Sequence, residues 1–244
     1  MRFAAKSDKG NVRETNEDCC NMISGYPGIP VTFIIADGMG GHNSGEIASR
    51  TAIDYISNSI LKTAGLFSDN SDIAGTVKKL MLEANQSVYE ESVKYTGNHG
   101  MGTTLTITVI AGKIMYVGHV GDSRLYLIRN DAITQITTDH SYIEELVRNG
   151  SLTREEADKH PSKHIITRAL GCTAELEVDT YICEMEENDL FVLCTDGLTN
   201  MLDEDEIKRI VSSNPPVEAC EELVDRANNN GGEDNITVIV IKNE

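Results

Sequence analysis

Three short β-rich runs, separated by turns of two or three residues, constrain the fold of this chain most strongly. The runs are 103–111, 114–120 and 124–129, and the turns are Gly112-Lys113 and Gly121-Asp122-Ser123. So short a connection returns the chain antiparallel to itself, because a parallel neighbour needs a crossover of about a dozen residues or more. The sequence therefore predicts sheets built from hairpins and argues against a doubly wound parallel sheet.

Helical segments alternate with strands along the rest of the chain. Helices are predicted at 45–61, 73–95, 142–147, 204–211 and 216–228. Further strands are predicted at 31–36, 132–137, 176–183, 190–195 and 236–241. Antiparallel strands interspersed with helices favour an α+β fold in which helices cover stacked sheets.

The length of 244 residues is enough for one sizeable hydrophobic core, so we expect a single domain spanning 1–244. The stretch 149–171 is polar, with short helical character at 153–158. It carries too little apolar surface to join that core. We therefore predict a surface flap, with boundaries at about 142–170.

The charge balance narrows the choice of partners. The chain has 39 acidic and 21 basic side chains, a formal net charge of −18. Nucleic acids and anionic membranes are bound by basic patches, so neither is expected as a partner. No apolar run approaches the roughly 20 residues of a membrane span, and the amino terminus, charged from Lys6 onwards, does not resemble a signal peptide. We expect a cytoplasmic protein, and a monomer.

Cysteine usage agrees with a reducing compartment. No C-x-x-C pair is present among the six cysteines, which are Cys19, Cys20, Cys172, Cys183, Cys194 and Cys220. Three of them lie in or beside predicted strands. Buried reduced thiols are therefore favoured over a disulfide framework or a zinc site.

Aspartates stand where several predicted strands end or begin, at Asp37, Asp122, Asp196 and Asp234. Any single Asp-Gly pair is an ordinary turn. Four carboxylates brought together in one cleft would raise one another's pKa unless divalent cations occupied the site. Oxygen ligands, without a cysteine or histidine set at zinc spacing, favour Mg²⁺ or Mn²⁺. The pattern predicts such a metal site if the aspartates converge.

A glycine-rich loop follows the predicted strand at 31–36, with glycines at Gly38, Gly40, Gly41 and Gly45. Its spacing does not match a dinucleotide-binding loop, which would need glycine in place of Asn43, and no P-loop lysine follows. We expect these glycines instead to let the backbone approach a metal, with a carbonyl as one ligand.

Seven motifs in a fixed order run over essentially the whole chain. They are GNVR at 10–13 with NED at 16–18, ADGMGGH at 36–42, GTT at 102–104, VGDSR at 120–124, DHS at 139–141, LCTDGL at 193–198 and GEDNIT at 232–237. On these motifs the chain resembles the bacterial type of metal-dependent type-2C serine/threonine protein phosphatases.

The resemblance implies a β-sandwich of two antiparallel sheets flanked by helices, with a two-metal centre at one end of the sheets. By analogy, Asp37 bridges two Mn²⁺ or Mg²⁺ ions and the Gly38 carbonyl completes the coordination of one of them. Asp196 and Asp234 hold the other ion, and Asp122 together with Asp196 holds a third, weaker one.

The resemblance also implies how substrate is bound and what it is. Arg13 matches the arginine that grips the substrate phosphate, and Asp18, beside Glu17, matches a residue that acts through water. The implied activity is hydrolysis of phosphoserine and phosphothreonine by a hydroxide that the two metals activate. The implied partners are phosphorylated proteins, including a bacterial kinase of the eukaryotic-like serine/threonine type.

The proton donor for the leaving group stays open. Animal members of the family carry a histidine where this chain has Met39. His42, His160 or a metal-bound water are the alternatives, whereas His119, on a predicted strand, is expected to be a packed residue.

Two other functions compete with a general phosphatase. One is a catalytically silent module that keeps the fold and binds phosphoproteins, and the complete aspartate set argues against it. The other is a phosphatase dedicated to a single regulatory protein. Because no sensor domain is attached, a general phosphatase is favoured over this alternative.

Overall fold

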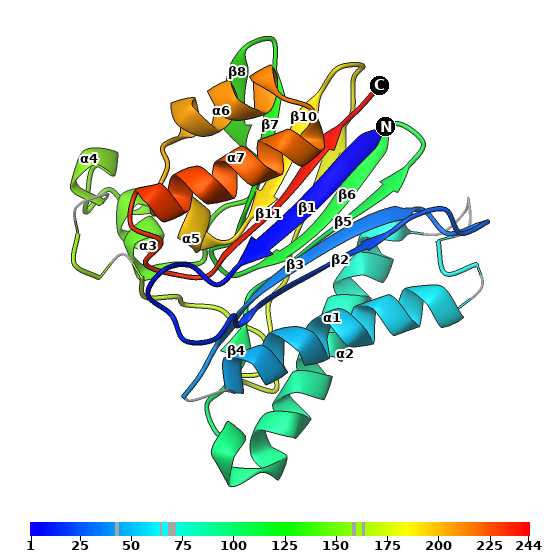
Figure 1. Ribbon diagram of the computed structural model, residues 1–244. Coiled ribbons are helices and arrows are strands. Elements are labelled where there is room, and N and C mark those ends of the chain that lie inside the picture. Colours follow the sequence, from blue (N-terminus) through cyan, green and yellow to red (C-terminus); the bar gives the residue numbers. More distant parts are fainter. Residues whose placement is uncertain (42–43, 64, 68–71, 158–159, 163) are drawn as a thin grey trace.

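The computed structural model describes residues 1–41, 44–63, 65–67, 72–157, 160–162 and 164–244. Two antiparallel sheets pack face to face, and helices cover the outer face of each (Figure 1). The first sheet has the order β1-β11-β10-β7-β8, with strands Arg2–Asp8, Ile236–Lys242, Leu190–Cys194, Arg124–Arg129 and Ala132–Gln135. The second has the order β2-β3-β5-β6-β9, with strands Asp18–Ile23, Val31–Met39, Leu105–Ala111, Ile114–Val120 and Asp179–Glu184; the short β4, Gly102–Thr103, also pairs with β3.

Strand β3 shows why the central strands have almost continuous apolar sequences. Phe33 and Ile35 pack between the two sheets, whereas Ile34 and Ala36 pack against the helices outside the second sheet. Successive side chains of a strand point to opposite faces, so a strand that is covered on both sides needs apolar residues at every position. Strand β3 therefore lies between two hydrophobic layers.

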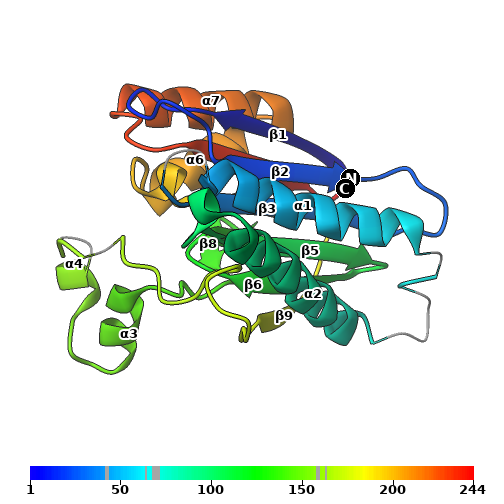
Figure 2. The ribbon, with the colours of Figure 1, turned by 90° about the horizontal axis from the view of Figure 1, so that it is seen from below.

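Helices α1, Ser44–Lys62, and α2, Ile73–Lys94, cover the second sheet, as the view from below shows (Figure 2). The short 3₁₀ helix η1, Thr96–Asn98, follows α2. The first sheet is covered by α5, Asp196–Thr199, α6, Glu204–Ser213, and α7, Pro216–Asn229. Two aspartates begin helices by accepting backbone N–H groups: Asp72 from Gly75, and Asp203 from Glu206.

Between β8 and β9 the chain leaves the two sheets. This segment carries α3, Tyr142–Arg148, and α4, Arg154–Ala157, and lies at one end of the molecule (Figure 1). The backbone N–H of Tyr142 donates to the Ile165 carbonyl, and that of Thr167 donates to the His140 carbonyl. Residues 142–170 thus leave and return through one narrow base, and we call them the flap segment.

The predicted α+β fold with two antiparallel sheets is confirmed, but the hairpin predicted at Gly121-Asp122-Ser123 is wrong. Strand β6 pairs with β5 and β9 in the second sheet and β7 pairs with β10 and β8 in the first, so this short turn carries the chain from one packed sheet to the other. Strands β1 and β2 were not predicted, because both lie at sheet edges, are only partly buried and lack a clear apolar pattern. Strand β3 also runs further than predicted, so that Asp37 lies inside it.

All six cysteines are free, as predicted, but only Cys194 and Cys220 are buried. Cys19, Cys20 and Cys183 are half-buried and Cys172 is exposed, so the prediction of buried thiols is wrong at Cys172 and only partly met at the other three. No helix in the described part of the chain is long and apolar enough to cross a membrane.

Candidate active site

The four predicted aspartates lie around one cavity of about 570 Å³ at the same end of both sheets. Asp37 is near the end of β3, Asp122 is in the turn from β6 to β7, Asp196 is the first residue of α5 and Asp234 precedes β11. Arg13, Gly38 and Met39 also line this cavity. The structure therefore brings together residues from both sheets and from both ends of the sequence.

Two threonines fix the backbone of Asp37. The Thr104 N–H and the Thr103 hydroxyl both donate to the Asp37 carbonyl, at 2.8 and 2.9 Å. The Asp37 N–H in turn donates to Thr104 Oγ1 at 2.9 Å. Asp18 lies directly opposite Asp37 in the pairing of β2 with β3. The N–H and the carbonyl of Asp37 are thus both hydrogen-bonded to these threonines, and its carboxylate is the group that faces the cavity.

Close backbone contacts require glycine at two points of the site. A Cβ on Gly197 would stand 1.9 Å from the Asn235 carbonyl, and one on Gly38 would stand 2.1 Å from the Gly45 carbonyl. The first contact sets Asp196 beside Asp234, and the second sets Asp37 beside the start of α1. Both distances are far below any that a side chain could accept, so glycine is required for the aspartates to converge.

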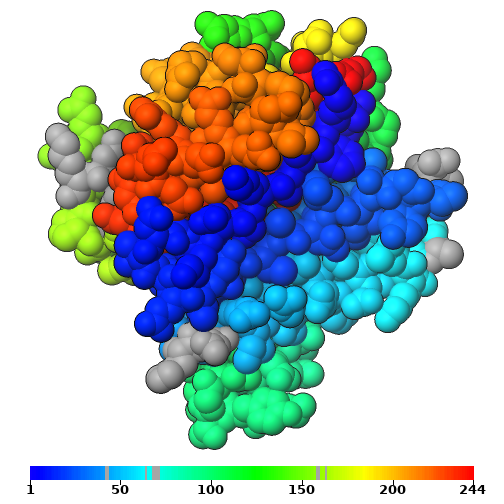
Figure 3. Space-filling view, viewed as in Figure 1, coloured from blue at the N-terminus to red at the C-terminus, as the bar shows by residue number. Residues whose placement is uncertain are grey.

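Asn235 holds the loop that carries Arg13. Its side-chain amide donates to the carbonyls of Lys9 and Thr15, at 2.8 and 2.9 Å, and its Oδ1 accepts the Glu17 N–H at 2.8 Å. Figure 3 shows the same relation from outside: the N-terminal segment, in blue, lies against the C-terminal helix, in orange. Arg13, half exposed, reaches Asp234 with Nη2 at 2.7 Å from Oδ2.

The electrostatics of the cavity match crowded carboxylates. Burial and the charges of Asp18, Asp196 and Asp122 raise the pKa of Asp37 well above its usual value. Burial raises the pKa of Asp18 to about 7, although the Thr237 and Thr195 hydroxyls bonded to it oppose the shift. Burial, followed by a neighbouring aspartate, likewise raises the pKa of Asp122 and of Asp196. A cation placed among these groups would relieve their mutual repulsion.

The donor set suits a hard divalent cation. Buried oxygens of Glu17, Asp18 and Asp122 have no hydrogen-bond partner in the part of the chain that the structure describes, although buried carboxylate oxygens ordinarily find one. Among the described residues, however, no three acidic, histidine or cysteine side chains form a closed set of ligands around one point. The carboxylates therefore line the cavity without three of them already gathered at one point, and an ion held by three of them would have to draw them together.

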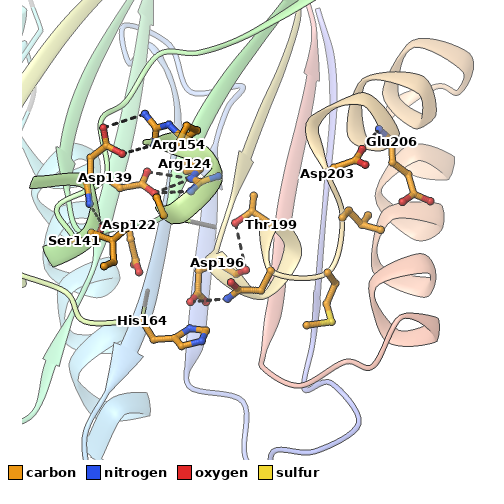
Figure 4. A pocket seen from close by; sticks show the side chains of 16 residues that line it. Asp122, Arg124, Asp139, Ser141, Arg154, His164, Asp196, Thr199, Asp203 and Glu206 are labelled. Atoms are coloured by element: carbon orange, nitrogen blue, oxygen red, sulfur yellow. Dashed lines mark hydrogen bonds and ion pairs between the residues drawn. The ribbon is translucent and has the colours of Figure 1, made fainter. Parts of the chain in front are cut away.

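A second cavity of about 480 Å³ adjoins the first and shares Asp122, Asp196 and His164 with it (Figure 4). His164 is an exposed residue of the flap segment, and its side chain lies near Asp196 (Figure 4). No motif in the sequence singled out His164, since only the return of the flap segment places it at the cavity.

Of the other candidate histidines, those that the structure describes do not line either cavity. His42 lies outside the described residues. His160 is half-buried in the flap segment, where its Nδ1 accepts the Ser162 N–H. His119 is fully buried, as the sequence indicated. Met39, the residue that stands where a histidine occurs in animal relatives, does line the first cavity.

Three supporting residues had no predicted role. Thr104 and Asn235 hold the backbone around Asp37 and Arg13, and Asn200 donates from Nδ2 to Asp196 Oδ2 at 3.0 Å. Thr104 and Asn235 bond segments that are distant in the sequence, whereas Asn200 bonds Asp196 across the short helix α5. The motifs at 102–104 and 232–237 contained two of them, but a motif alone does not say which member orients which neighbour.

Comparison with known proteins gives one consistent result. Residues 11–236 match the family described as protein phosphatase 2C. The chain is 37% identical to the serine/threonine phosphatase stp of Listeria monocytogenes over 245 residues, covering 100% of this chain and 96% of that protein. It is also 37% identical to the protein phosphatase PhpP of Streptococcus pneumoniae, covering 99% of this chain and 97% of that protein.

Solved structures agree in fold. The serine/threonine phosphatase of S. agalactiae superposes with a TM-score of 0.93 at 35% identity, covering 100% of this chain and 99% of that one. The catalytic domain of PstP in complex with two manganese ions superposes with a TM-score of 0.86 at 32% identity, covering 100% and 98%. With a matching sequence family, fold and arrangement of acidic strand ends, the chain belongs to the protein phosphatase 2C family of metal-dependent serine/threonine protein phosphatases.

Proposed function

We propose that this chain hydrolyses phosphoserine and phosphothreonine in proteins with the help of two Mn²⁺ or Mg²⁺ ions. The observation that carries the proposal is the set of crowded, partly unpartnered carboxylates around the cavity at the sheet ends. When bound, such a pair of ions supplies a hydroxide for in-line attack on phosphorus and offsets charge on the phosphoryl oxygens. The complex of PstP with two manganese ions supports this choice of cofactor.

In this proposal each metal ion has its own set of ligands, and some residues belong to two sets. Asp37 bridges the two ions, the Gly38 carbonyl adds a ligand to one, and Asp196 and Asp234 hold the other. Asp122, whose Oδ1 has no partner, joins Asp196 in holding a third, weaker ion. Support comes from the position of all five residues along one cavity.

Arg13 binds the substrate phosphate in this proposal. Its guanidinium lies at the rim of the cavity and uses one nitrogen, Nη2, on Asp234. An arginine has five N–H donors in a planar fork, so others remain to face two oxygens of one phosphate. The contact with Asp234 also fixes where the fork stands relative to the acidic cluster.

The leaving serine or threonine oxygen must gain a proton. His164 lines the cavity and His160 does not, so we propose His164 or a water as the donor. Exposed to solvent at the cavity, an imidazole can exchange its proton between turnovers.

The substrates are phosphorylated proteins. We propose that they include the targets of a bacterial serine/threonine kinase, and that residues 142–170 of the single domain act as a flap beside the bound phosphopeptide. The acidic second cavity, which adjoins the first, would favour basic residues near the phosphate. A cytoplasmic location and a monomeric state stay predictions.

Release of phosphate from a phosphothreonine peptide tests the proposal. The purified chain should turn over the peptide with Mn²⁺, stop when EDTA is added in excess, and recover when Mn²⁺ is restored. Activity that survives complete removal of metal would contradict the proposal. Binding of Mn²⁺ without any turnover on phosphoserine or phosphothreonine peptides would instead support the silent module.

A further inference from the structure

The turn that carries Asp122 is held from one side by a single residue, His140. The backbone N–H of His140 donates to the Gly121 carbonyl at 2.8 Å, and the Gly121 N–H donates to His140 Nδ1 at 3.1 Å. His140 is 5% exposed, so these bonds form away from solvent. Both polar groups of Gly121 are therefore satisfied by the same residue.

These contacts fix which ring nitrogen of His140 carries the proton. A backbone N–H can only donate, so Nδ1 accepts and the proton of the neutral ring is on Nε2. Nε2 lies 3.1 Å from Asp179 Oδ2, to which it donates. The other oxygen of Asp179 accepts Arg168 Nη1 at 3.0 Å. A continuous chain of polar contacts thus runs from Gly121 to Arg168.

The far end of this chain of contacts is the base of the flap segment. Arg168 lies where the chain returns from the flap segment to the sheets, and the neighbouring Thr167 N–H donates to the His140 carbonyl at 2.8 Å. His140 itself stands two residues before α3, where the flap segment begins. One residue therefore contacts the turn of Asp122 through its ring and its backbone N–H, and the flap base through its carbonyl and, by way of Asp179, its ring.

The turn has little freedom to find another position. Gly121 has a φ of +111°, and a Cβ there would stand 2.5 Å from the side chain of Thr104. Thr104 in turn bonds the Asp37 N–H and lies 2.8 Å from Ser123 through its hydroxyl. A displacement of Gly121 would thus move Asp122 relative to Asp37.

We infer that His140 is a positioning residue that sets Asp122 beside Asp37 and links this placement to the flap base through Asp179 and Arg168. The inference rests on the proposed role of Asp122 as a metal ligand. Nothing in it requires His140 to contact substrate or metal.

Two substitutions separate the two halves of the link. In His140→Asn the side-chain oxygen can take the place of Nδ1 and accept the Gly121 N–H, but the reach to Asp179 is lost. In His140→Gln the side-chain nitrogen can take the place of Nε2 and donate to Asp179, but the acceptor for Gly121 is lost. We expect His140→Gln to weaken Mn²⁺ binding at the weakest site by about tenfold, as loss of a residue that orients a ligand does.

The measurements are Mn²⁺ titration by calorimetry and limited trypsin cleavage of the flap segment in EDTA. His140→Asn should keep the Mn²⁺ affinity of the wild type and be cleaved faster in the flap segment. His140→Gln should bind Mn²⁺ more weakly and be cleaved in the flap segment at the rate of the wild type. Equal effects of the two substitutions on both measurements would overturn the inference, since a purely structural histidine predicts no such split.

His119→Gln is the matched control. His119 is buried beside His140, with ring centroids 4.9 Å apart, but bonds Thr106 and the Thr138 carbonyl instead of the turn. It should lower the unfolding temperature and leave Mn²⁺ affinity unchanged; a change in Mn²⁺ affinity as large as that of His140→Gln would overturn the inference.

Asp122→Asn distinguishes failure of the proposed ligand role of Asp122 from failure of the positioning role of His140. If it leaves Mn²⁺ binding unchanged, the ligand role of Asp122 fails and the inference with it; if it weakens binding and His140→Gln does not, only the inference fails.

Discussion

The turns that carry the aspartates and the flap segment beside them share a cavity but are built in opposite ways. Gly38, Gly121 and Gly197 all stand where a side chain would collide with neighbouring atoms. The flap segment is attached by backbone bonds at its base, and an ion pair between Glu144 and the exposed Arg154 joins its two short helices to each other. One region is fixed by close contact, and the other by bonds that water can replace.

This difference separates chemistry from recognition. A reaction at phosphorus needs its ligands placed to within a fraction of an ångström, which only close-packed backbone supplies. A phosphatase with several protein substrates instead needs an adjacent surface that can adjust to different peptides. We therefore expect changes in the aspartate turns to reduce kcat, and changes in the flap segment to act mainly on KM.

The largest effect should follow from Asp37→Asn. The substitution keeps the volume of the side chain and removes the charge proposed to bridge the metals, so kcat should fall by more than about 10³-fold, as when the group that generates a nucleophile is lost. The folded structure should persist, because repulsion from the other aspartates is reduced. Turnover of phosphothreonine peptide and circular dichroism check both parts, and wild-type kcat would show that Asp37 is no ligand.

Gly197→Ala should come next. The added carbon would stand 1.9 Å from the Asn235 carbonyl and would push Asp196 away from Asp234. A displacement of about 1 Å at a catalytic centre costs roughly 100-fold in rate. Gly41→Ala is the control, because no atom of the described residues lies within 4 Å of a Cβ there. Equal activity of the two variants would show that close contact is not what sets the site.

Arg13→Ala should act on substrate binding. A charge-assisted hydrogen bond is worth about 2 kcal/mol, so KM for the phosphopeptide should rise roughly 10- to 30-fold with a smaller change in kcat. Arg13→Lys keeps the charge without the fork and should fall between. Steady-state kinetics with saturating Mn²⁺ decide, and an unchanged KM in Arg13→Ala would remove its phosphate role.

The pH dependence of stability should distinguish the two regions further. Because the pKa of Asp18 is raised to about 7 and that of Asp37 is raised as well, the folded state without metal binds protons that the unfolded state has released. The unfolding temperature in EDTA should therefore fall as the pH rises from about 6.5 to about 8. Buried His119, with its pKa lowered to about 4, is already neutral across this range.

Calorimetry in EDTA and in Mn²⁺ tests this expectation. Bound metal should remove the decline, because it compensates the same carboxylates. A stability in EDTA that rises over this range would mean that the acidic cluster is not under repulsion. Asp37→Asn, with one acidic group fewer, should show a shallower decline than the wild type.

The smallest effect should come from the flap segment. The Arg154 side chain is 64% exposed, and exposed ion pairs contribute at most about 1 kcal/mol. Arg154→Ala should change the free energy of unfolding by less than that and leave kcat unchanged, with only a modest shift in KM. A kcat loss comparable to that of Gly197→Ala would erase the proposed contrast between the two regions.

The parts that sequence predicts well are local ones. The hairpin around Gly112 follows from the length of its turn, and the four aspartates stand out because each ends or begins a predicted strand. The family resemblance then assigns their roles. The turn at Gly121 is equally short but joins strands of two different sheets, which its length alone does not reveal. That β3 continues through Asp37 to Met39 was not predicted, since the continuation depends on pairing with β4.

The parts that sequence does not predict depend on distant contacts. Strands β1 and β2 have weak patterns of their own and are fixed by their partners β11 and β3. Asn235 and His164 become important only when the N-terminal loop and the flap segment reach the cavity. The sequence around Asn235 and His164 does not indicate which distant segment each of them contacts.

The pairing of β1 with β11 has a consequence for how the enzyme is made. Arg2 lies opposite Lys242 and Asp8 opposite Ile236. Strand β1 therefore cannot pair until β11, which is translated more than 200 residues later, has been synthesised. Asp234 and Asn235, which complete the acidic cluster and hold the Arg13 loop, arrive with that partner. Contacts this distant form late in folding. A nascent chain should therefore have no phosphatase activity until β11 has been synthesised and has paired with β1.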